Sequence, residues 1–256
     1  MLNSDTNNNI INLKSKFAKI KELRYIKCNY YDNGTPGRMF ETLLNKKKDN
    51  LRLPDYDGIE IKALLKKNHY DLTLFSIIPQ LDNMSCDQII SYFFRTFFYE
   101  NINLKWKIVN SKFYSTISSN QTVYLRNNLS FKLIFDDINH RVVLSYHSKI
   151  KSSTSRIIYW NYSDIAKTFI SKLSFLALVI YNKYVIKNSI YVHYYNMDIY
   201  RGKNNRISLL KSGDIYIKFN ISSKKNISDD YVPHYHGTEF IIKINSIDKL
   251  FKKIEF

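Results

Sequence analysis

The sequence predicts a mixed α/β protein in which 256 residues form one continuous unit. Apolar residues make up 45% of the chain and aromatic residues 15%, which is enough for a packed core. Segments with apolar residues at helical spacing alternate with segments in which every second residue is apolar. Gly and Pro number only 6 and 4, so few linkers are available to separate domains.

Helices are predicted near the start of the chain. Residues 1–9 are polar and predict a frayed terminus, whereas apolar residues from Leu13 onward recur at helical spacing with lysines on the other faces. A turn over 34–37 should lead into a short helix that buries Phe40 and Leu44. That helix is expected to end at the basic run 46–48, where cations suit the helix dipole.

The hydrophobic period then changes to two. Over 58–65, apolar residues alternate with Glu60 and Lys62, which predicts a strand that carries both charged side chains on one face. A second strand is expected over 72–78. A helix with an aromatic face is expected over 87–99.

The rest of the chain is predicted to be rich in strands. They are expected within 106–147 and over 191–200, 215–221 and 240–244. Within the first of these ranges, 129–135 should pair with 142–146 across a polar turn. Ser163 or Asp164 is a suitable N-cap for a further helix, and an amphipathic helix is expected over 247–254.

The charge balance limits the choice of partners. A formal net charge of +17 favours a polyanion, either nucleic acid or an anionic membrane surface, although a chain that is simply basic is the plain alternative. No apolar run approaches the length of a membrane span, and the polar N-terminus lacks the apolar stretch of a secretory signal. Cys28 and Cys86 form neither a disulfide framework nor a metal cluster, so a cytoplasmic location is expected.

Asp55, Glu60 and Lys62 could together form a catalytic metal site. Two carboxylates, one at the entry to the strand and one within it, provide the all-oxygen ligands that Mg²⁺ prefers. Lys62 would reach the same face, where its ammonium group could orient the attacking water or stabilise charge in the transition state. The pattern alone is weak, because an exposed Glu–Lys pair on a solvated strand face would look the same.

Longer stretches give a more specific signal. They are, in chain order, 34–44 (GTPGRMFETLL), 54–62 (PDYDGIEIK), 72–75 (LTLF), 209–217 (LLKSGDIYI) and 236–240 (HGTEF). Together they resemble the MvaI/BcnI restriction endonucleases, a group of PD-(D/E)XK nucleases that is related to the mismatch-repair nickase MutH. The first stretch alone could be shared with MutH or Sau3AI-like enzymes, whereas the last two favour the MvaI/BcnI group.

The resemblance implies a PD-(D/E)XK core, in which a central mixed sheet is flanked by helices. A single endonuclease domain over 1–256 would comprise a catalytic and a recognition lobe that grip double-stranded DNA in a cleft between them. The resemblance further implies that Asp55 and Glu60 bind Mg²⁺ and that Lys62 is catalytic. Glu41 would lie beside them, where it holds a second metal ion or orients the site, with an exposed helix residue as the alternative.

Contacts with DNA are expected from basic residues and one histidine. The candidates are Arg38, Lys66, Lys67, Arg201 and Lys203 as phosphate contacts and, by resemblance, His236. Two residues depart from the family pattern: Asn45 stands where the family often has Gly, and Glu239 is unexpected beside DNA. These departures concern recognition and leave the predicted active site intact.

The function expected from these features is that of a type II restriction endonuclease. It would hydrolyse phosphodiester bonds of double-stranded DNA at a short sequence with Mg²⁺, as a monomer, beside a separate DNA methyltransferase and without a membrane partner. One alternative is a MutH-like nickase of DNA repair. Another is a basic DNA-binding protein without catalytic activity, in which the acidic pair is incidental.

Overall fold

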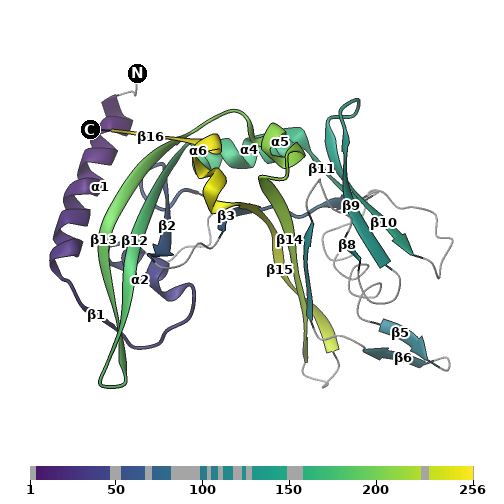
Figure 1. Cartoon of the computed structure of the whole chain (residues 1–256), viewed down its shortest axis with the longest axis horizontal. Coiled ribbons are helices and arrows are strands. Elements are labelled where there is room, and N and C mark those ends of the chain that lie inside the picture. The colour runs from purple at the N-terminus through teal and green to yellow at the C-terminus, as the bar shows by residue number, and fades with distance from the viewer. Residues whose placement is uncertain are drawn as a thin grey trace. The chain divides into compact units, whose positions relative to one another are not determined.

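The computed structural model confirms a mixed α+β fold (Figure 1). It describes residues 4–46, 53–66, 71–81, 99–102, 105–108, 112–117, 123–124, 129–148, 158–225 and 231–255. The helices in this part of the chain are α1 (Ser4–Glu22), α2 (Thr35–Leu43), α4 (Tyr162–Leu173), α5 (Arg206–Lys211) and α6 (Ile247–Leu250), with a 3-10 helix at Ile244–Ser246.

The strands form separate sheets. The first sheet has the order β1 (Ile26–Cys28), β13 (Ser189–Gly202), β12 (Phe175–Ile186) and β2 (Ile59–Leu65), and β16 (Phe251–Lys253) also pairs with β13. The second has the order β4 (Gln80–Leu81), β11 (Ile158–Asn161), β10 (Arg141–Ser148), β9 (Leu129–Asp136) and β8 (Val123–Tyr124). The third has the order β3 (Leu72–Ser76), β15 (Tyr231–Ile242), β14 (Ile215–Lys225) and β7 (Lys112–Ile117), while β5 (Tyr99–Ile102) pairs with β6 (Lys105–Ile108).

The chain divides into two compact units, and each is assembled from segments far apart in sequence. Unit 1 comprises Met1–Asp71, Phe169–Asn204 and Ile244–Phe256, and unit 2 comprises Leu72–Thr168 and Asn205–Lys243. Unit 1 contains the first sheet, in which β2 is parallel to β12 and β12 is antiparallel to β13. Helix α4 begins in unit 2, and its last turn belongs to unit 1.

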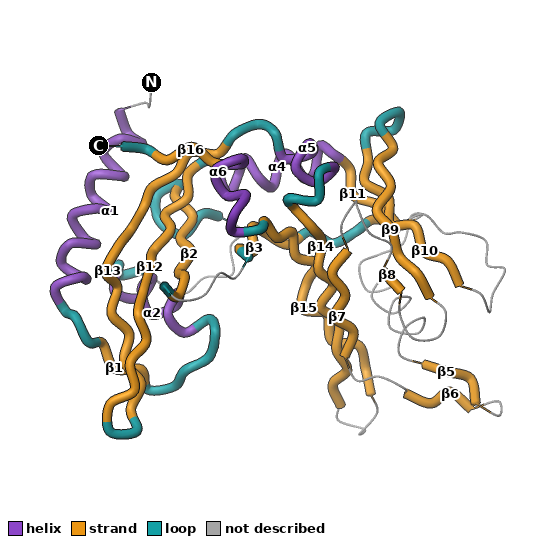
Figure 2. Tube along the Cα trace, in the orientation of Figure 1, coloured by secondary structure: helices purple, strands orange, loops and turns teal. Residues whose placement is uncertain are grey.

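One face of the first sheet is covered by α1 and α2, and Figure 2 shows α1 running alongside β13. Ile10 and Leu13 of α1 and Phe40 of α2 are fully buried, and they belong to the same core cluster as Ile59 and Ile61 of β2. The alternation predicted for β2 is thus observed, because its apolar residues face this core while Glu60 points to the other face.

A β-bulge keeps the core face of the long hairpin β12–β13 continuous. Tyr181 is opposite Tyr194, but its neighbour Ile180 is opposite Asn196, so that Tyr195 is the extra residue. Tyr194 and Met197, which are three residues apart, therefore both lie in the core cluster. Without the extra residue, the strict period of two would turn one end of β13 away from the core.

Tyr194 also fixes α2 on the sheet. Its hydroxyl donates a hydrogen bond of 2.6 Å to the carbonyl of Pro36, and its ring packs edge-on against Phe40 at 5.1 Å. Pro36 lies in the first turn of α2, where a proline needs no N–H partner. The turn expected over 34–37 is therefore mostly helix, because α2 begins at Thr35.

Several predicted boundaries were wrong. Residues 4–9, expected to be frayed, form the first turns of α1. The helix expected over 247–254 ends at Leu250, because Phe251 is buried and starts a strand that pairs with β13. Strand β12 and helix α5 were not anticipated at all.

Other predictions hold. Strands β9 and β10 pair as expected, and α4 runs to Leu173 although it begins at Tyr162, just before the predicted caps. Most of the helix expected over 87–99 lies outside the described residues. Within the described chain, no helix has the length and apolar character needed to cross a membrane.

Gly202 lets the end of α4 dock against β13. Its N–H donates a hydrogen bond of 3.0 Å to the carbonyl of Ser174, directly after the helix. A Cβ atom at this position would come within 2.6 Å of the Leu173 carbonyl oxygen and 2.9 Å of the Phe169 ring. Because the Leu173 atom belongs to the backbone, the helix end would have to move to admit any side chain.

We expect Gly202→Ala to lower the free energy of unfolding by about 2 kcal/mol, the usual cost of forcing an extra carbon into a packed site. The matched control is Gly37→Ala in α2, where an added Cβ meets nothing within 4 Å. The control should raise stability by about 0.5–1 kcal/mol, because alanine is the better helix former. Urea denaturation of the two variants checks both signs, and equal stabilities would contradict the docking role of Gly202.

Candidate active site

A tight turn brings Asp55 beside β2. Tyr56 and Ile59 exchange two backbone hydrogen bonds, of 2.9 and 2.7 Å. The residues between them, Asp57 and Gly58, have positive φ angles of 42° and 87°. Such a two-residue turn reverses the chain, and Asp-Gly is a sequence that favours it. Asp55 consequently accepts a hydrogen bond of 3.0 Å at Oδ2 from the backbone N–H of Ile61.

Glu60 is a buried carboxylate with two cationic neighbours. Only 1% of the residue is exposed. Its Oε1 accepts hydrogen bonds from Lys62 Nζ at 2.8 Å and from Lys172 Nζ at 3.4 Å. Its Oε2 is also buried and has no hydrogen-bond partner among the described residues. The Glu–Lys pair is therefore not a solvated strand face.

Asp55 is paired with a lysine that follows α2. Lys46 Nζ lies 3.1 Å from Asp55 Oδ1, and both side chains are largely buried. The end of α2 places Lys46 there, because Asn45 has a positive φ of 63° and the N–H of Lys46 bonds back to the Glu41 carbonyl at 3.0 Å. Asn and Gly are the residues that adopt this helix end most readily, so Asn45 can stand where the resemblance led us to expect Gly.

Glu41 lies within the electrostatic field of the same group of residues. Burial raises the pKa of its carboxyl group, and the charges of Asp55 and Glu60 raise it further, while Lys46 and Lys62 lower it. The structure thus gathers all four residues that were predicted to be catalytic. Lys172 is an addition that no sequence pattern indicated, since it comes from α4, far along the chain from β2.

The oxygen atoms of this group fit a hard divalent cation. Glu60 Oε2 is a buried acceptor without a partner among the described residues, and the Asp55 carboxylate lies beside the same strand. Within the described residues there is no group of three or more Asp, Glu, His or Cys side chains arranged to bind a metal ion. Mg²⁺ needs no such cluster, because it commonly uses one or two carboxylates and completes its shell with water and phosphate oxygens.

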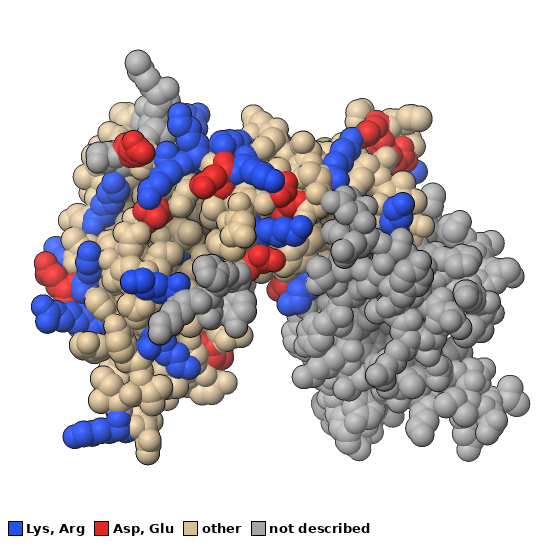
Figure 3. All heavy atoms as spheres, in the orientation of Figure 1, with Lys and Arg blue, Asp and Glu red and all other residues tan. Residues whose placement is uncertain are grey.

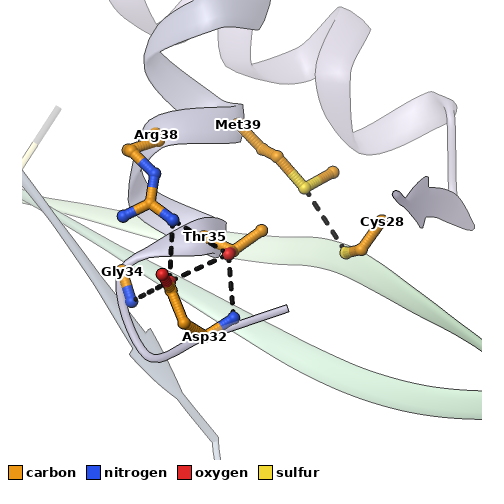
Figure 4. Close-up of polar contacts among 6 residues, drawn as sticks. All are labelled: Cys28, Asp32, Gly34, Thr35, Arg38 and Met39. Atoms are coloured by element: carbon orange, nitrogen blue, oxygen red, sulfur yellow. Dashed lines mark hydrogen bonds and ion pairs between the residues drawn. The ribbon is translucent and has the colours of Figure 1, made fainter. Parts of the chain in front are cut away.

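The residues predicted to bind DNA are scattered. Arg38 is braced against the turn before α2: its Nη2 donates to Asp32 Oδ1 at 2.7 Å and to Thr35 Oγ1 at 3.1 Å (Figure 4). The bond from Arg38 is the main reason that the pKa of Asp32 lies below its ordinary value. The ammonium group of Lys66 lies 4.7 Å above the centre of the Tyr195 ring.

Two further predicted DNA contacts, Arg201 and Lys203, lie at the end of β13 and directly after it. Arg201 of β13 pairs with Phe175 of β12, which in turn pairs with Ile59 of β2. Paired residues on neighbouring strands point to the same face of a sheet, so the side chain of Arg201 lies on the face that α1 covers, opposite to that of Glu60. Lys203 Nζ donates to the Asp248 carbonyl at 2.6 Å. Lys67 lies outside the described residues, as does the side chain of His236, a residue of β15.

Comparison with known proteins places this chain among nucleases. The model of the MvaI/BcnI restriction endonuclease family matches residues 14–251. The fold is similar to that in the restriction endonuclease MvaI–cognate DNA substrate complex, with a TM-score of 0.78, 21% identity and coverage of 95% of this chain and 96% of that chain. For restriction endonuclease MvaI in the absence of DNA, the TM-score is 0.55 at 20% identity, with 96% of each chain covered.

A search of curated proteins finds no match to the sequence. The two MvaI structures are too distant in sequence to establish more than the fold, so the family model carries the assignment. That model extends over nearly the whole chain, from the middle of α1 to the first residue of β16. The chain therefore belongs to the MvaI/BcnI restriction endonuclease family.

Proposed function

We propose that this protein is a Mg²⁺-dependent type II restriction endonuclease that cleaves double-stranded DNA at a short specific sequence. The observation that carries the proposal is the buried Glu60, which keeps one oxygen without a partner among the described residues and lies beside Lys62. A buried carboxylate oxygen without a hydrogen-bond partner lowers the stability of the folded protein, and a bound cation would offset that loss. Family membership supports a site-specific nuclease.

Each residue of the site would then have a distinct role. Asp55 and Glu60 would hold Mg²⁺, which supplies Lewis acidity to the phosphate and an acidified water when bound. Lys62, at 2.8 Å from Glu60, would orient the attacking water or stabilise the negative charge that develops in the transition state. Glu41, whose partly buried carboxylate lies among the charges of Asp55 and Glu60, would hold a second metal ion or orient the site.

Duplex DNA is the proposed partner. The net charge of +17 suits a polyanion, and Figure 3 shows basic side chains spread over the visible face of unit 1, interspersed with acidic ones. We assign catalysis to unit 1, which contains all four proposed catalytic residues, and recognition to unit 2, which contains His236. Arg38, Lys66, Lys67, Arg201 and Lys203 remain proposed phosphate contacts, and a cytoplasmic monomer that works beside a DNA methyltransferase remains the proposed setting.

Digestion of a mapped plasmid by the purified protein tests the proposal. With Mg²⁺, linear fragments with ends at fixed positions are expected, and EDTA should prevent their formation. Open circles alone would favour a nickase. Binding that needs no metal, without any cleavage, would favour a DNA-binding protein that lacks catalytic activity.

Asp55→Asn should abolish cleavage, because a neutral amide is a poorer ligand for Mg²⁺. The same change should tighten binding to duplex DNA in EDTA. It removes a negative charge that repels phosphate and releases the Lys46 ammonium group from its ion pair, which together are worth about 1 kcal/mol in a partly buried site. Gel-shift titration in EDTA and plasmid cleavage in Mg²⁺ measure the two effects. A folding defect would weaken both properties, and wild-type cleavage would mean that Asp55 is not a metal ligand.

Lys62→Ala should remove cleavage, and the cleavage rate should fall far more than the roughly tenfold by which the lost charge weakens duplex binding, because the role of Lys62 is realised mainly in the transition state. Lys62→Arg is the matched variant, since it keeps a positive charge beside Glu60 but changes the position of the hydrogen-bond donors. We expect the arginine variant to fold like the wild type and to cleave far more slowly. Single-turnover kinetics measure the cleavage rates of both variants and the wild type. A near wild-type rate for the alanine variant would refute the role of Lys62.

A further inference from the structure

Lys172 is a basic residue of the site to which the proposed mechanism gives no role. It comes from the last turn of α4, and its ammonium group lies 3.4 Å from Glu60 Oε1. Lys62 binds the same oxygen at 2.8 Å. Both cations therefore share one oxygen of the carboxylate, while Oε2, the oxygen proposed for the metal ion, has no partner among the described residues.

The formal charges of the site cancel when no metal ion is present. The residues concerned are the carboxylates Glu41, Asp55 and Glu60 and the lysines Lys46, Lys62 and Lys172. Lys46 pairs with Asp55 at 3.1 Å, and the other two lysines contact Glu60. If Lys172 were neutral, the group would carry a net negative charge, and the side chain of Glu60, only 2% exposed, would keep a single cationic partner.

We infer that Lys172 is the counter-charge that allows the site to accept a DNA phosphate before a metal ion binds. The inference rests on the proposed function and adds an order of events to it. A phosphate anion that approaches excess carboxylate charge in a partly buried site is strongly repelled, and Lys172 offsets this repulsion through Glu60. Duplex DNA could then be held in the site without metal, with Asp55 and Glu60 still placed to hold a metal ion beside the phosphate.

The same charge has the opposite effect on a metal ion. A divalent cation at Glu60 Oε2 would share that carboxylate with two ammonium groups, and like charges at such short range repel each other. Lys172 therefore lowers the affinity of the DNA-free protein for metal ions. Lys172 acts through Glu60 and is a positioning residue, in contrast to Lys62, whose proposed role is at the reacting atoms.

The test compares Lys172→Met with the wild-type protein. Methionine keeps an unbranched apolar chain of similar length and removes the charge. We expect Mn²⁺ alone to bind the DNA-free variant about tenfold more tightly, and duplex DNA in EDTA to bind about tenfold more weakly, since one unit charge at this range is worth at least that factor. Titration of Mn²⁺ followed by electron paramagnetic resonance measures the first effect, and a gel shift measures the second.

Lys19→Met is the matched control. Lys19 is an exposed residue of α1, the helix that covers the opposite face of the sheet, and its loss changes the net charge by the same amount. This control should leave Mn²⁺ affinity unchanged. Lys172→Arg should restore both properties toward the wild type, because it returns the charge. Lys172→Gln, which is neutral and can still donate a hydrogen bond to Glu60, repeats the test if the methionine variant does not fold.

The outcomes separate this inference from the proposed function. If Lys172 merely holds the Glu60 side chain in place, its loss will weaken Mn²⁺ binding, which overturns the inference. Unchanged affinity for both Mn²⁺ and DNA overturns it as well, while Mg²⁺-dependent cleavage by the wild type would leave the proposed function standing. A wild-type protein that neither binds Mn²⁺ nor cleaves DNA would overturn both.

Discussion

The carboxylate of Glu60 is buried on one face of the first sheet, and the arrangement of the site follows from the need to stabilise this buried charge. Removing a charge from water is costly unless hydrogen bonds and opposite charges compensate, and here Lys62 and Lys172 supply both at one oxygen. Lys62 follows in the same strand, but Lys172 requires that the end of α4 be docked on the sheet, which Gly202 permits. The buried charge of Glu60 thus links β2 to α4, whose end is docked against β13.

The sequence was informative wherever the structure is local. The alternation in β2 predicted which side chains face the core and which lie on the opposite face, and the apolar spacing of α2 predicted the burial of Phe40. Lys172 could not be predicted, because its contact with Glu60 depends on the docking of two elements far apart along the chain. Phe251 was misplaced in a helix for the same reason, since pairing with β13 overrides a helical pattern of apolar residues.

The ends of α2 show how local backbone geometry serves the site. Pro36 at the start receives the Tyr194 hydroxyl, and Asn45 at the end turns the chain so that Lys46 reaches Asp55. Glu41 lies between these two fixed points and therefore has little freedom to move away from the other carboxylates. Asn is one of the residues that adopt a positive φ readily, so Asn45 suits this turn.

The turn at Asp57 and Gly58 also bears on how the site can change over evolution. Gly58 has open space where a Cβ atom would lie, but its φ of 87° is one that other residues adopt reluctantly. Backbone conformation, and not crowding, therefore restricts this position, so that Asn or Asp should replace Gly58 more readily than Ala does. The number of residues between Asp55 and Glu60 is likewise a property of the turn type. A homologue with a longer interval would need a different loop to bring the same two carboxylates together.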